Sequence, residues 1–344
     1  MSKIIFSKSV NYCSKPILID GFSGSGKILV ADLLKAIDET ELYKWELSFD
    51  YIPILYSLNG IRKTAASSTI KTIFDEITYN LVIGREINIR KSDFSSVFSH
   101  PKKFSYLKSI LEINKKNDNY IRNEIAPNMN IPLIVHMSTF NNHFYEEVFE
   151  NKLKLFYTLR DPLFLIETYS SYLDRISEDP REFTVKIKYM NIDLPWFSIG
   201  WDEEYLSVNN TEKSIRLLQI CFNILSKKII SNKYKNQFYK LIFFEEIIKY
   251  TDIIFEDLIL FLGLNYSNKL FQKIKSKNKV PRTNNNIVDG YWKRYTFGGL
   301  SREGEGEEKL LERTKSQVSP YYFNLLKDLR YKYFNFKETY SIIN

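Results

Sequence analysis

The sequence predicts an α/β protein with a central parallel sheet and helices on both of its faces. Three short apolar runs, residues 16–20, 131–136 and 154–159, have the length of buried strands. The first and the third lead directly into a loop and an amphipathic helical pattern, and repeated strand–loop–helix units are typical of parallel sheets. A chain of 344 residues can form one large domain or two small ones, and we expect a single domain over residues 1–344.

The remaining elements follow from periodicity and from residues that end helices. The first strand continues into a helix at 28–37, and further helices are predicted at 67–82, 106–115, 211–231, 251–262 and 317–333. Residues 239–244 are predicted to be another strand. Residues 177–210 have weak periodicity and are interpreted as an insertion on the substrate side, and residues 298–308 are expected to be a mobile loop.

Composition excludes several classes of protein. The hydrophobic fraction of 44% argues against a disordered chain, and two cysteines without metal-ligand spacing allow neither a disulfide framework nor a usual zinc site. No apolar run reaches the roughly 20 residues that span a bilayer. The net charge of +8 is dispersed and no nucleic-acid recognition motif is present. We therefore expect a cytoplasmic protein that binds neither membranes nor nucleic acids.

A glycine-rich loop after the first strand has the spacing of a phosphate-binding loop. Gly21, Gly26 and Lys27 form a Gly-x-x-x-x-Gly-Lys pattern between a predicted strand and a predicted helix. Magnesium-dependent kinases and ATPases need a Ser or Thr hydroxyl after the lysine, but this position is Ile28. The pattern therefore favours phosphate binding for a transfer that needs no metal, and we expect no metal site.

Four segments together resemble the sulfotransferases that use 3′-phosphoadenosine 5′-phosphosulfate (PAPS). In the first, Gly24-Ser25-Gly26-Lys27-Ile28 is similar to the family's loop for the 5′-phosphosulfate, although the family's cationic first residue is replaced by Gly24. The resemblance implies a P-loop sulfotransferase-like fold. It also implies that these five residues bind the co-substrate and that Lys27 assists catalysis.

The second and third segments supply an arginine, a hydroxyl and a histidine. Arg160-Asp161-Pro162, with Thr168 eight residues after the arginine, resembles the family's site for the 3′-phosphate. His136 follows an apolar strand and resembles the catalytic base of many members, because imidazole accepts a proton near neutral pH. Other members use a carboxylate, so Glu124, Asp202 and Glu203 remain alternatives.

The fourth segment lies late in the chain. Residues 241–246 and 261–264 resemble the family's strand with an acidic pair and its Phe-Leu-Gly-Leu helix end, and Trp292, Lys293 and Arg294 resemble its segment near the adenosine. The family's Arg-Lys-Gly is absent here, so Arg282, Lys293 or Arg294 is expected to supply the missing charge.

The resemblance implies transfer of a sulfonate group from PAPS to a hydroxyl or amine. A small molecule, with a carbohydrate as the first expectation, is the predicted acceptor, and Trp196, Trp201 and Glu203 are the candidate substrate residues because aromatic platforms beside acids suit sugars and phenols. The aromatic residues equally suit packing over a hydrophobic edge. A P-loop kinase of a small metabolite and a non-catalytic nucleotide-binding module are the alternative functions. The sequence predicts neither the oligomeric state nor the identity of the acceptor.

Overall fold

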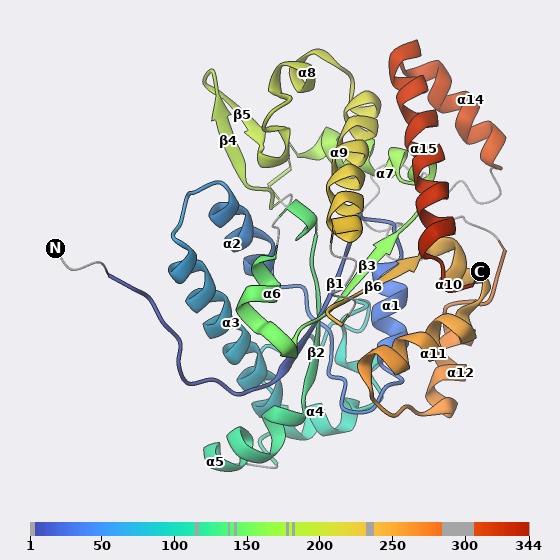
Figure 1. The fold of residues 1–344 in the computed structure, drawn as a ribbon. Helices are drawn as coiled ribbons and strands as arrows, with labels where there is room; N and C mark the ends of the chain where they lie inside the picture. Colours follow the sequence, from blue (N-terminus) through green and yellow to red (C-terminus); the bar gives the residue numbers. More distant parts are fainter. Residues whose placement is uncertain are drawn as a thin grey trace. The chain divides into compact units, whose positions relative to one another are not determined.

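Four parallel strands form the main sheet of the computed structural model (Figure 1), which describes residues 4–113, 117–136, 138–140, 143–176, 179–180, 183–231, 237–283 and 306–343. The strands are β1 (Lys15–Gly21), β2 (Asn130–Ile134), β3 (Lys154–Leu159) and β6 (Tyr239–Phe243). Their order is β2-β1-β3-β6, and every neighbouring pair is parallel. The four predicted strands are therefore confirmed. His136, predicted to end the second strand, lies two residues beyond it.

The described chain divides by its internal contacts into two compact units. The first unit comprises Met1–Gly21, Gly26–Leu159 and Asn232–Thr283, and the second comprises Phe22–Ser25, Arg160–Ser231 and Asn284–Asn344. The main sheet belongs to the first unit. The interpretation of residues 1–344 as one domain stays a prediction.

The helices of the first unit flank the sheet on both sides. Figure 1 shows α2, α3 and α6 on one side of the strands and α1, α11 and α12 on the other, which confirms the predicted α/β class. Ile17, Leu18 and Ile19 of β1 have no exposed surface, as expected for a strand covered on both faces. The helix bounds are α1 Lys27–Leu34, α2 Leu47–Ser57, α3 Lys63–Ile83, α4 Lys103–Ile110, α5 Asp118–Tyr120, α6 Phe144–Phe149, α10 Phe244–Lys249, α11 Thr251–Leu262 and α12 Asn268–Lys277.

The second unit is mainly helical. Helix α9 (Asn210–Ser231) packs against α7 (Ile166–Arg175) and α15 (Pro320–Tyr340), and α14 (Glu307–Gln317) contacts α15. Two antiparallel strands, β4 (Lys186–Tyr189) and β5 (Ile192–Pro195), form a hairpin before the short helix α8 (Asp202–Ser207). The described part of the predicted insertion at 177–210 therefore contains regular structure that its weak periodicity did not predict.

Several predicted boundaries differ from the observed ones. Helix α4 ends at Ile110 rather than at residue 115, and α15 begins at Pro320 rather than at residue 317. Proline suits the first turn of a helix because it lacks the N–H that has no acceptor there. Of the predicted loop at 298–308, residues 298–305 lie outside the described residues, while Glu307 and Glu308 begin α14.

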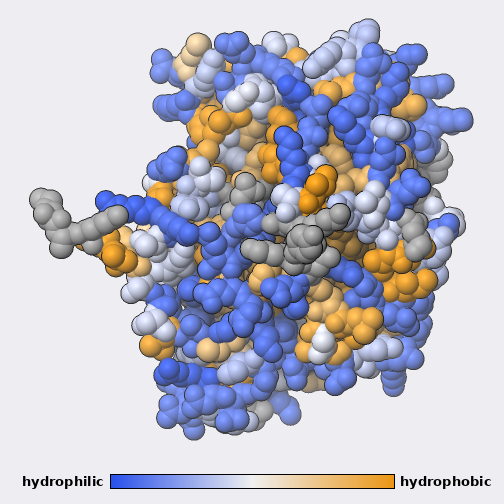
Figure 2. All heavy atoms as spheres, viewed as in Figure 1, coloured by the Kyte–Doolittle hydropathy of each residue, from blue (hydrophilic) through white to orange (hydrophobic). Residues whose placement is uncertain are grey.

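Hydrophilic residues predominate over α3 and α4 on the face that Figure 2 shows. No helix within the described residues is both long and apolar enough to cross a membrane.

Candidate functional site

The first turn of α1 offers backbone donors at the end of the glycine-rich loop. Gly26 precedes the helix with φ +104°, and a Cβ at this position would lie 2.8 Å from Cδ2 of Phe244. This close approach and the left-handed backbone together require glycine. No side chain of the described residues caps this helix start. The first N–H groups of α1, that of Ile28 included, therefore present the positive end of the helix to an anion.

Residues 22–25 of the loop belong to the second unit and are held by hydrogen bonds. The backbone N–H of Ser23 donates to the hydroxyl of Tyr169 over 3.1 Å. Both the N–H and the hydroxyl of Ser25 donate to the carbonyl oxygen of Phe22, over 3.1 Å and 2.6 Å. A phosphate that takes either donor of Ser25 must therefore compete with this carbonyl.

Arg160 and Thr168 meet the loop at Gly24, within the second unit. The Nη1 atom of Arg160 donates to the carbonyl oxygen of Gly24 over 2.8 Å, and the guanidinium carbon lies 5.3 Å from the ring centre of Phe164. A Cβ at Gly24, where φ is +87°, would lie 3.8 Å from the hydroxyl oxygen of Thr168. We call Ser23, Gly24, Arg160, Thr168 and Tyr169 the arginine cluster. It brings together residues from both of the predicted phosphate-binding segments.

A second arginine fixes the residue that follows Arg160. Arg330 of α15 donates through Nε and Nη2 to the carboxylate of Asp161, at 2.9 Å and 2.7 Å, and through Nη2 to Glu307 at 2.6 Å. The same carboxylate of Asp161 accepts the N–H of Leu163 over 3.0 Å. Because Asp161 is 2% exposed, this forked ion pair is shielded from water and holds the turn after β3 in place.

Lys27 points back along β1 into a buried acidic environment of the first unit. Its ammonium donates to the carbonyl oxygen of Gly21, and its side chain is largely buried. Asp20, which is fully buried, accepts the N–H of Gly21 over 2.7 Å and the hydroxyl of Ser138 over 2.6 Å. Burial lowers the pKa of Lys27 to about 8, although the charges of Asp20 and Asp50 oppose this shift.

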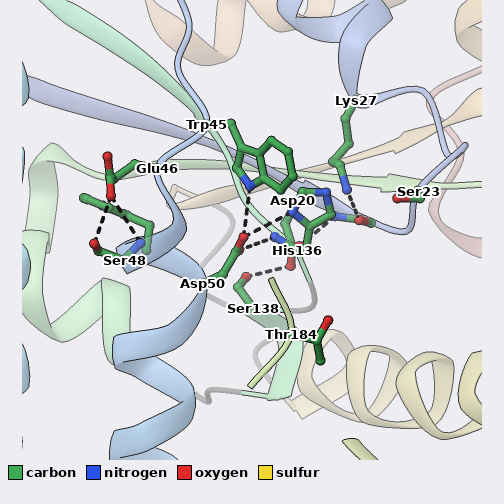
Figure 3. Close-up of polar contacts among 12 residues, drawn as sticks. Asp20, Ser23, Lys27, Trp45, Glu46, Ser48, Asp50, His136, Ser138 and Thr184 are labelled. Atoms are coloured by element: carbon green, nitrogen blue, oxygen red, sulfur yellow. Dashed lines mark hydrogen bonds and ion pairs between the residues drawn. The ribbon is translucent and has the colours of Figure 1, made fainter. Parts of the chain in front are cut away.

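His136 is held by a carboxylate that it shares with a tryptophan, as Figure 3 shows. The Oδ1 atom of Asp50 accepts the backbone N–H of His136 over 2.6 Å, and Oδ2 lies 3.2 Å from Nδ1 of the imidazole. The indole Nε1 of Trp45 donates to the same Oδ2 over 3.2 Å. Among the described residues, Nε2 of His136 has no hydrogen-bond partner. We call Asp20, Lys27, Trp45, Asp50, His136 and Ser138 the imidazole cluster.

The predicted aromatic platform is largely buried. Trp196 and Trp201 are each 7% exposed, and the indole N–H of Trp201 donates to the carbonyl oxygen of Phe197 over 2.7 Å. Their rings pack against Phe197 and Tyr205 within the second unit. This burial favours the packing interpretation of the two tryptophans. Glu203 of α8 is exposed, and its carboxylate helps to raise the pKa of Tyr189, after the effect of desolvation.

The remaining candidates are not part of either cluster as described. Trp292, Lys293 and Arg294 lie outside the described residues. Of the alternative bases, Glu124 is exposed in the short helix η2 (Ile121–Ile125), and Asp202 accepts the N–H of Gly200 over 3.2 Å at the start of α8.

Sequence reasoning missed several residues of the two clusters. Trp45, Asp50, Ser138 and Tyr169 are not among the site residues that the sequence predicts. The sequence could have indicated Asp20, because a carboxylate at the end of a buried apolar strand needs a hydrogen-bond partner. No sequence pattern indicates Trp45 as a site residue, because nothing in the local pattern shows that its segment lies beside β2.

The comparisons with known proteins found similar solved structures but no similar sequences. No family model and no curated protein matches the sequence. The sulfotransferase domain of the olefin synthase of Synechococcus PCC 7002 is 13% identical, with a TM-score of 0.42, over 96% of this chain and 98% of that chain. The sulfotransferase domain of the curacin biosynthetic pathway has the same identity and TM-score, over 94% and 98%. Retinol dehydratase, solved with androsterone and the inactive cofactor PAP, is 13% identical, with a TM-score of 0.37, over 94% and 82%.

Proposed function

We propose that this protein is a sulfotransferase that moves a sulfonate group from PAPS to a hydroxyl of a small-molecule acceptor. The observation that carries the proposal is the arginine cluster, in which Arg160 donates to Gly24 and Thr168 lies beside it. These residues come from the two segments that the family resemblance assigns to the phosphates of one nucleotide.

The arginine cluster has the chemistry of a site for the 3′-phosphate. Arg160 has a forked guanidinium that donates to the loop at Gly24, and Thr168 adds a neutral hydroxyl. Gly24, Ser25 and Gly26 shape the loop, and Lys27 and the N–H of Ile28 are the donors that we assign to the phosphosulfate. Trp292, Lys293 and Arg294 are proposed for the adenosine end. PAPS itself supplies the sulfonate group and the leaving phosphate.

His136 is the proposed base. A proton on Nδ1 that is donated to Asp50 leaves Nε2 as the acceptor nitrogen, so the carboxylate selects the tautomer that the reaction needs. Nε2 then takes the proton of the acceptor hydroxyl while the new oxygen–sulfur bond forms and the bond from sulfur to the phosphate oxygen breaks.

Lys27 is proposed to neutralise the charge that develops on the leaving phosphate. A buried ammonium acts more strongly on a nearby anion than an exposed one, because little water screens it. Ile28 has no oxygen for a magnesium ion at the position where kinases use one. The proposed transfer therefore uses cationic side chains where a kinase uses a metal.

The test is calorimetric titration with 3′-phosphoadenosine 5′-phosphate (PAP) in EDTA. We expect wild-type protein to bind PAP and Arg160→Ala to bind it about 100-fold more weakly, since a charge-assisted pair is lost. Arg90→Ala is the matched control, because it removes the same charge from a side chain that is 79% exposed.

Two outcomes would replace the proposal. Binding of ATP with Mg²⁺ but not of PAP supports the small-metabolite kinase. Binding of PAP without turnover of PAPS on any hydroxyl or amine supports a non-catalytic nucleotide-binding module.

A further inference from the structure

We propose that Trp45 forms the binding surface for the acceptor, and that the acceptor carries its hydroxyl on a ring with a flat apolar face. This inference rests on the proposed function, because it assigns the acceptor to the histidine that we propose as the base. It names a tryptophan of the first unit in place of the buried Trp196 and Trp201.

The path of the chain brings Trp45 to His136. Residue Lys44 pairs with β2, since its N–H donates to the carbonyl oxygen of Pro132 over 3.0 Å and its own carbonyl oxygen accepts the N–H of Ile134 over 2.9 Å. Trp45 follows this pairing directly, and His136 follows the same stretch of β2 by two residues. The two rings consequently lie on neighbouring segments of the chain, with centroids 5.3 Å apart.

The exposed indole is held in a fixed orientation. Trp45 is 52% exposed, which is unusual for the largest apolar side chain, and its hydrogen bond to Asp50 restrains the ring. Because the indole N–H is already donated, the ring surface that remains open is largely carbon. A rigid carbon surface beside a proton acceptor is suited to stacking a ring that presents a hydroxyl.

The charges beside the indole favour a neutral acceptor. Asp50 is 7% exposed and accepts hydrogen bonds from both rings, and Glu46 follows Trp45 and caps α2 through Ser48. Asp50 and Glu46 disfavour an anionic acceptor, and the ammonium of Lys44, which interacts with Glu46 and Glu86, offsets part of this effect. An aromatic alcohol and a sugar share the required chemistry, namely a neutral hydroxyl on a ring with an apolar face.

The experiment measures binding of three neutral alcohols to protein that is saturated with PAP. Naphthol provides an aromatic ring, methyl galactoside provides a sugar ring, and hexanol is acyclic. We expect wild-type protein to bind at least one ring alcohol and to bind hexanol more weakly. Trp45→Ala should lower the affinity for the ring alcohol by ~10-fold or more, and Trp45→Phe should retain part of that affinity. Phe104→Ala is the matched control, because Phe104 is 68% exposed on α4.

Each outcome decides the inference. Loss of ring-alcohol binding in Trp45→Ala, with PAP affinity unchanged and part of the ring-alcohol affinity retained in Trp45→Phe, supports it, and the better-bound ring identifies the acceptor as aromatic or sugar. The inference is overturned if hexanol binds as tightly as the ring alcohols, if neither ring alcohol binds, or if Trp45→Ala keeps the wild-type affinity for the ring alcohol. In each of these cases the proposed function still stands if PAP binds. Failure of wild-type protein to bind PAP refutes the proposed function and this inference with it.

Discussion

The arginine cluster and the imidazole cluster are built from different kinds of contact. In the second unit, Arg160 is bonded to the loop and the neighbouring Asp161 is clamped by Arg330, so permanent charges fix the backbone. In the first unit, burial lowers the pKa of Lys27 beside the buried Asp20, and the imidazole of His136 lies against the carboxylate of Asp50. The first arrangement suits the holding of a phosphate, and the second suits the movement of a proton. Substitutions in the two clusters should therefore change different measurements.

The largest expected effect tests the chemical role of the imidazole cluster. His136→Gln removes the base and should lower kcat by ~10²- to 10⁴-fold with whichever ring alcohol binds, because general-base catalysis contributes about that much. PAP affinity, measured in the same preparations, should stay at the wild-type value. An unchanged kcat would transfer the role to one of Glu124, Asp202 and Glu203.

The next effect concerns the buried ammonium of Lys27. Its pKa is about 8 in the folded protein and 10.5 in the unfolded chain, so between these values the unfolded chain binds more protons and folding stability rises with pH. Relative to Lys27→Met, the free energy of unfolding of wild-type protein should rise by roughly 3 kcal/mol across this window. Denaturant titrations of both proteins at several pH values measure the difference, and parallel pH profiles would contradict it.

The smallest effect tests whether the arginine cluster is positioned from α15. Arg330→Gln removes the ion pair with Asp161 and should lower the affinity for PAP by ~10-fold, since hydrogen bonds between charged groups each contribute about 1.5–3 kcal/mol. Adenosine 5′-phosphate lacks the 3′-phosphate, so its affinity should not change. Arg330→Lys should restore part of the affinity for PAP. Equal losses for the two nucleotides would indicate a general structural defect instead.

The elements of the main sheet were predictable because their signals are local. The strand at 154–159 and the helix at 251–262 have the observed bounds, since apolar runs and helix-ending residues lie within the segments themselves. The hairpin β4–β5 was missed because all four residues of β4 and the first two of β5 are at least partly exposed, which leaves no continuous apolar run.

The candidate site was predictable only where a family resemblance supplied it. That resemblance drew attention to Arg160, Thr168 and His136, and the structure adds the partners that orient Arg160 and His136. Asp50 and Arg330 lie far along the chain from the residues they hold, and a polar contact between distant segments leaves no periodic pattern in a sequence. The prominent tryptophans of the insertion were chosen by residue type alone, which does not distinguish a buried ring from an exposed one.

The segment that carries Trp45 also protects the sheet from association with other chains. Strand β2 stands at the end of the strand order, where an unpaired edge can recruit a strand from another molecule. Bridges at Thr40 and Lys44 occupy this edge, and Pro132 within β2 lacks the N–H that an incoming strand needs. Loosening the segment at 40–44 would therefore favour aggregation as well as displace the acceptor surface, so solubility and acceptor binding are subject to one structural constraint.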